Sequence, residues 1–119
     1  MKTGKANKQI EKVIALVEKE GVLAKSLIEE LKELREHALK EEDPLLAKVT
    51  RLTYEYIEEN EAFDIQALWE EDEEGGEYPL EIEDKDNLLN LLNLLLKSDH
   101  KINREEIKDY RTALKEELY

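Results

Sequence analysis

The sequence predicts a mainly α fold: a compact bundle of about five helices, with a small acidic β-hairpin inserted between the third and fourth helices. Apolar residues recur at helical spacing along most of the 119 residues. Two short stretches on either side of Gly75-Gly76 instead alternate with a period of two, which is typical of paired strands. Hydrophobic residues make up 40% of the chain and no linker divides it, so residues 1–119 are expected to form one domain.

The first predicted helix covers residues 7–20. Its apolar positions follow the spacing of one buried helix face: Ile10, Val13, Ile14 and Val17. Asn7 is the expected N-cap and Gly21 the expected end. Residues 1–7 are polar and basic, and are predicted to form a flexible tail.

The second and third helices are predicted as an antiparallel hairpin. A stripe of apolar residues from Leu23 to Leu39 predicts a helix that ends near Glu42. Asp43-Pro44 then starts the next helix, because Asp is a good N-cap and Pro fits the first helical position. The third helix is expected to end near Asn60.

Residues 62–83 are predicted to form the hairpin insertion. Alternation over 63–69 and 78–82 predicts two strands, and Pro79 indicates an edge position. Helical spacing also fits residues 63–70, so a short helix there, and with it an all-α fold, remains an alternative.

The fourth helix is predicted to run to Lys97 with Asp84 or Asp86 as its cap. Residues 88–96 are so rich in leucine that we expect a helix in the middle of the bundle or, alternatively, a homodimer interface. The asparagines at 87, 90 and 93 form one strip, either in solvent or in buried hydrogen bonds. Asn103, with Glu106 three residues later, predicts a capping box for the fifth helix.

Acidic charge is concentrated in one segment. The chain has 18 basic and 31 acidic residues, a net charge of −13. Residues 55–86 contain fifteen of the acids and one lysine, so this segment accounts for the whole imbalance. Such a charge argues against direct binding to nucleic acid or an anionic membrane, and favours a basic protein as partner. The absence of cysteine excludes disulfides and is compatible with the cytoplasmic location that we expect.

The leading functional hypothesis is a non-enzymatic module for protein–protein interaction that uses the hairpin. Two aromatic anchors, predicted to pair across the strands, and six steering carboxylates are the expected contacts: Trp69, Tyr78, Glu70, Glu71, Asp72, Glu73, Glu74 and Glu77. A narrower version makes the protein an inhibitor of a basic protein, or a mimic of DNA.

No catalytic motif, metal site or cofactor site is predicted. His37 and His100 lack a second ligand or nucleophile at a suitable spacing, and the chain has no Gly-rich phosphate loop. A protein that binds a small ligand or divalent metal through carboxylates, and a structural homodimer through 88–96, are the alternative hypotheses.

Overall fold

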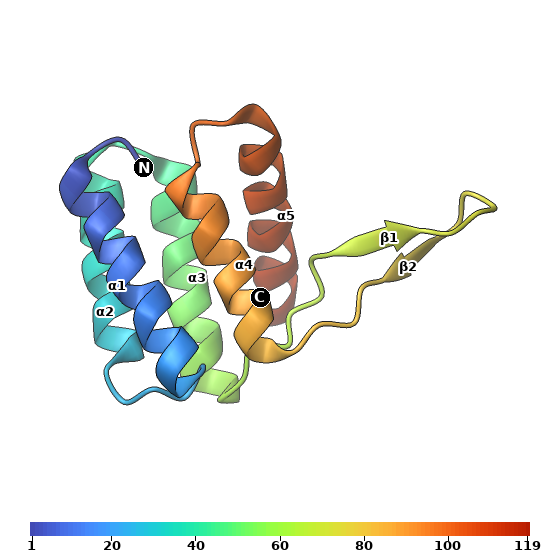
Figure 1. The fold of residues 1–119 in the computed structure, drawn as a ribbon, viewed down its shortest axis with the longest axis horizontal. Coiled ribbons are helices and arrows are strands. Elements are labelled where there is room, and N and C mark those ends of the chain that lie inside the picture. Colours follow the sequence, from blue (N-terminus) through green and yellow to red (C-terminus); the bar gives the residue numbers. More distant parts are fainter.

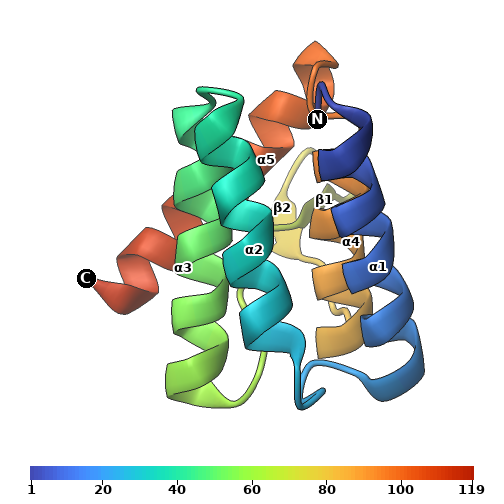
Figure 2. The same cartoon turned by 90° about the vertical axis from the view of Figure 1, so that its left-hand side faces the viewer.

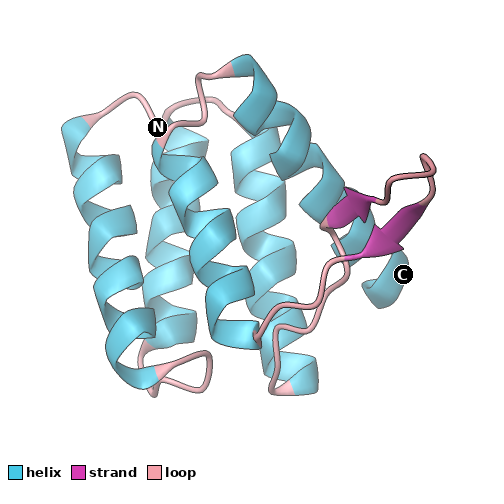
Figure 3. Cartoon of the chain, turned by 45° about the vertical axis from the view of Figure 1, so that its right-hand side comes forward, coloured by secondary structure: helices cyan, strands magenta, loops and turns pink.

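Five helices and one antiparallel hairpin make up the chain in a computed structural model that describes residues 1–119. The hairpin follows the third helix and precedes the fourth along the chain, and Figure 3 shows its two strands beside the helices. The predicted mainly α fold is therefore confirmed and the all-α alternative is wrong. The elements in chain order are α1 (Gly4–Glu20), α2 (Leu27–Lys40), α3 (Pro44–Asn60), β1 (Trp69–Glu71), β2 (Glu77–Pro79), α4 (Asp84–Leu96) and α5 (Lys101–Leu118).

The helices are arranged as a ring in which each has two main neighbours. Helix α1 packs against α2 and α4, α3 packs against α2 and α5, and α4 and α5 close the ring (Figures 1 and 2). The expectation that the fourth helix runs through the middle is therefore wrong. One side of α4 faces outward, where Asn93 is exposed.

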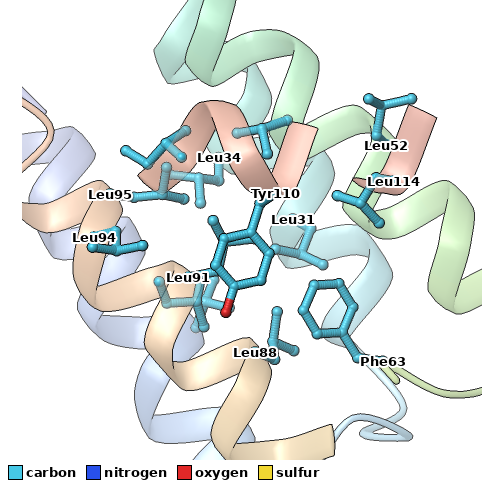
Figure 4. Packing of buried hydrophobic residues seen from close by; sticks show 14 of the residues in the cluster. Leu31, Leu34, Leu52, Phe63, Leu88, Leu91, Leu94, Leu95, Tyr110 and Leu114 are labelled. Carbon is cyan, nitrogen blue, oxygen red and sulfur yellow. The ribbon is translucent and has the colours of Figure 1, made fainter. Parts of the chain in front are cut away.

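The core fills the inside of this ring. Helix α4 contributes five buried leucines, and α5 contributes Tyr110, which lies next to Phe63 at the centre of the cluster (Figure 4). Only Leu89 and Leu96 of the leucines in 88–96 are partly exposed. Most of the apolar surface of α4 is therefore buried within the chain itself.

The cap of α3 follows the prediction. The Asp43 carboxylate accepts a hydrogen bond from Leu46 N at 3.3 Å, and Pro44 occupies the first helical position. Gly21 ends α1 at φ +79°, a conformation that glycine adopts without strain. Helix α2 begins at Leu27, later than the apolar stripe suggests.

The interpretation of residues 1–7 as a tail needs correction. Helix α1 already begins at Gly4, with Thr3 rather than Asn7 as its side-chain cap. The Glu41 carboxylate accepts hydrogen bonds from Lys2 N at 2.9 Å and Thr3 N at 3.1 Å. Partial burial raises the pKa of Glu41, but these N–H donors outweigh that effect and hold the pKa below its ordinary value. The segment is thus tied to the far end of α2.

The caps predicted for α4 and α5 are also wrong. Asp84 is the first residue of α4, and its carboxylate accepts from Phe63 N at 3.0 Å instead of capping its own helix. Helix α5 begins at Lys101, and the Asn103 side chain donates to Lys97 O at 3.0 Å. Both side chains satisfy backbone groups of the preceding segment, a choice that local spacing does not reveal.

Candidate functional site

The hairpin is an extension that projects from the bundle beside α5 (Figure 1). Its paired region is shorter than predicted, because only Trp69–Glu71 and Glu77–Pro79 form strands. Residues 63–68 lie outside the strands, although Leu68 O accepts a hydrogen bond from Leu80 N at 3.0 Å. Burial nevertheless alternates along this segment as predicted, since Phe63, Ile65 and Ala67 are buried against the helices. The alternative of a short helix at 63–70 is wrong.

Asn87 anchors the base of the hairpin to the bundle. Its side-chain nitrogen donates to Phe63 O at 3.1 Å and Ile65 O at 2.9 Å, and its oxygen accepts from the Tyr110 hydroxyl at 2.6 Å. The Phe63 ring stacks on the Tyr110 ring, with centroids 6.2 Å apart and planes 14° apart. Since Asn87 is 1% exposed, these hydrogen bonds replace water and fix the direction in which the hairpin leaves the core.

The Tyr110 hydroxyl is a donor in this network. Burial raises the pKa of Tyr110 to about 12, so the phenol stays protonated even at alkaline pH values at which an ordinary tyrosine begins to ionise. Asn90 donates to the same hydroxyl at 3.0 Å. The three asparagines of the predicted strip therefore differ in role. Asn87 and Asn90 take part in the buried hydrogen bonds around Tyr110, whereas Asn93 donates only to Leu89 O of its own helix.

The turn of the hairpin is organised by Asp72. One carboxylate oxygen accepts hydrogen bonds from Glu74 N at 2.9 Å and Gly76 N at 2.7 Å. Gly75 lies at φ +82°, and a Cβ on Gly76 would come within 2.9 Å of the Asp72 carboxylate. The two glycines and the Asp therefore form a tight turn that points the neighbouring glutamates outward.

The six carboxylates of the hairpin, here called the acidic tip, are all exposed: Glu70, Glu71, Asp72, Glu73, Glu74 and Glu77. None of the five ion pairs in the molecule includes one of them. Their charge is thus not neutralised within the chain. Six unpaired carboxylates on a narrow projection create a strongly negative potential around it.

The two aromatic residues of the hairpin lie on opposite faces. The register pairs Trp69 with Pro79 and Tyr78 with Glu70, so the predicted pairing of the two rings across the strands is wrong. Tyr78 instead donates to the Glu70 carboxylate at 2.8 Å, which raises the pKa of the phenol. Trp69 is 56% exposed and Tyr78 44% exposed, so each face carries one accessible ring.

No group of three or more His, Cys, Asp or Glu side chains is arranged to hold a metal ion. His37 lies on α2, and His100 precedes α5.

None of the helices combines the length and the apolar character that crossing a membrane requires.

Local sequence patterns do not reveal which side chains of α5 lie beside the hairpin. Helix α5 places the carboxylates of Glu106, Asp109 and Glu116 in the same groove as Trp69. Their spacing of three and seven residues puts them on one helix face, but only the fold shows that this face lies beside the hairpin.

No protein-family model matches the chain, and no curated protein or solved structure is significantly similar to it.

Proposed function

We propose that this protein is a non-enzymatic, cytoplasmic interaction module that binds a basic protein through its hairpin. The observation that carries the proposal is the acidic tip: six exposed carboxylates without an ion-pair partner, on a projection mounted firmly on a helical bundle. The exposed rings of Trp69 and Tyr78 add apolar contact area at the base of the same projection.

The physical role of the tip is to select and steer the partner. Complementary charge raises the rate of association and rejects acidic partners, whereas aromatic contacts account for most of the lifetime of a complex. A basic nucleic-acid-binding protein is the narrower candidate, because a row of carboxylates presents a row of negative charges similar to that of the phosphates in a nucleic acid. The protein would then act as an inhibitor or a DNA mimic.

Capture of a partner from a lysate of the host tests the proposal. The immobilised protein is compared with a tip variant in which Glu70, Glu71, Glu73, Glu74 and Glu77 become Gln and Asp72 becomes Asn. Asn at position 72 keeps an oxygen that accepts the turn hydrogen bonds. We expect the wild type to retain a basic protein at low salt, and expect both the tip substitutions and added salt to release it.

A matched control carries the same change in charge on the bundle. Six exposed glutamates without a side-chain hydrogen bond are replaced by Gln on α1, α2 and the following turn: Glu11, Glu18, Glu20, Glu33, Glu36 and Glu42. The control should retain the partner. A partner that the tip variant holds as well as the wild type, or the retention of no basic protein at all, would contradict the proposal.

A further inference from the structure

The base of the hairpin lies beside α5 (Figures 1 and 3). A groove between them includes Trp69 of β1 in its lining. It encloses about 500 Å³, within the range of roughly 300–1,000 Å³ typical of ligand sites. Ten residues line it: Gln66, Ala67, Leu68, Trp69, Glu77, Glu106, Asp109, Thr112, Ala113 and Glu116. The lining thus combines one large ring and three smaller apolar side chains with four carboxylates, and contains no basic residue.

The carboxylates of the groove have no partner within the chain. Glu77, Glu106, Asp109 and Glu116 take part in none of the ion pairs, and no side-chain hydrogen bond occupies them. On α5 the three acids flank Ala113, which leaves a shallow apolar floor between them opposite Trp69. A cationic side chain with an apolar stem would satisfy both kinds of lining at once.

We infer that this groove binds an arginine-rich segment of the basic partner. A guanidinium group can stack on the Trp69 ring while its N–H groups donate to the carboxylates of α5. Arginine suits the groove better than lysine because it offers a planar face and a fork of donors. The inference rests on the proposed function and adds a second contact region, which adjoins the tip and shares Glu77 with it, and it identifies the side chain recognised.

An octa-arginine peptide is a suitable probe, and two measurements separate the groove from the tip. Trp69 is the only tryptophan of the chain and lines the groove, so its fluorescence reports on binding in the groove or directly beside it. Titration calorimetry detects binding anywhere on the protein. We expect heat of binding together with a saturable change in Trp69 emission, both with the same midpoint.

Substitutions on α5 test the groove without altering the tip. In a variant with Glu106→Gln, Asp109→Asn and Glu116→Gln, the affinity for octa-arginine should fall about tenfold, since exposed ion pairs are individually weak. The control with Glu18→Gln, Glu33→Gln and Glu36→Gln carries the same charge change on α1 and α2 and should lose about twofold or less. Trp69→Leu keeps an apolar side chain and should weaken binding about two- to fivefold.

The outcomes distinguish the two proposals. Heat of binding without a change in Trp69 emission, or equal affinities of the α5 variant and its control, would overturn the groove and leave the acidic tip as the binding element. The absence of heat for the wild type would overturn both. Circular dichroism and thermal unfolding of each variant establish that the fold is retained.

Discussion

The helical bundle and the hairpin differ in how they use their polar side chains. In the bundle, polar side chains near the core form specific hydrogen bonds: Asn87 satisfies two carbonyls and a phenol, and Arg104 forms two hydrogen bonds with Asp43, at 3.0 and 3.1 Å. In the hairpin, six carboxylates face solvent without an ion-pair partner. These contacts stabilise the bundle, whereas no carboxylate of the acidic tip forms an ion pair that would stabilise the fold.

The largest expected effect on stability comes from removing the side chain that joins the hairpin to the bundle. Asn87→Ala leaves Phe63 O, Ile65 O and the Tyr110 hydroxyl without this partner in a buried position, so the free energy of unfolding should fall by about 3 kcal/mol. Urea unfolding measures the loss. Asn93→Ala, in an exposed position of the same helix, is the control and should change stability by no more than about 0.5 kcal/mol. Equal losses in the two variants would show that Asn87 does not anchor the hairpin.

A second prediction concerns the pair that joins the α2–α3 turn to α5. Partial burial raises the pKa of Asp43, but hydrogen bonds from Arg104 and Leu46 N more than compensate, so the pKa lies below its ordinary value. The ionised carboxylate therefore stabilises the fold above the ordinary Asp pKa of about 4, and this stabilisation is lost as the pH falls through the lower pKa of the folded state.

Asp43→Asn should accordingly cost about 1–2 kcal/mol at pH 7. The difference from the wild type should shrink below about pH 4, where the unfolded carboxyl is protonated. Chemical unfolding between pH 3 and pH 7 tests this expectation. A difference that stays constant over the whole range would mean that the charge of Asp43 is not what stabilises the junction.

A smaller effect is expected at the turn of the hairpin. Gly75→Ala forces an L side chain to a φ of +82° and should destabilise the turn by about 1 kcal/mol. The bundle should be unaffected, so thermal unfolding should match that of the wild type while amide exchange at residues 70–78 becomes faster. If the free energy of global unfolding fell by the full amount, the hairpin and the bundle would unfold as one cooperative unit, and the expectation that the turn opens independently would be wrong.

The smallest effect on stability should come from the six-residue tip variant. Removing unpaired, exposed charges should leave the free energy of unfolding unchanged, or raise it by a few tenths of a kcal/mol because repulsion is relieved. Urea unfolding of the tip variant and its bundle control provides the comparison. A marked loss in the tip variant alone would indicate that the carboxylates have a structural role.

The sequence predicts the helices well because their apolar faces repeat over several turns. It also predicts the position of the hairpin, since the alternation from Phe63 to Ala67 and the two glycines are local signals. What it misses is which of several possible partners a polar side chain binds. Asp84 and Asn103 have the character of caps, yet each satisfies backbone outside its own helix. Arg104 lies 61 residues from Asp43, and no local pattern reveals such a pairing.

For the candidate site, the sequence identifies the exposed acids but not the geometry of the aromatic residues. Whether Trp69 faces Tyr78 depends on a register shift of one residue, which places a side chain on the opposite face of the hairpin. Among the carboxylates of α5, the sequence singles out only Glu106, as part of a predicted capping box. They join Trp69 only because the ring of helices places α5 beside the base of the hairpin.

The footprint of the captured partner tests most directly the claim that the hairpin binds while the bundle supports it. Amide hydrogen exchange of the protein, measured with and without the partner, reports which backbone segments become protected. We predict protection over residues 66–79 and, if the groove is occupied, along the adjacent face of α5, with α1 and α2 unchanged. Protection on α1 and α2 with an unaltered hairpin would contradict this account and would transfer the binding surface to the bundle.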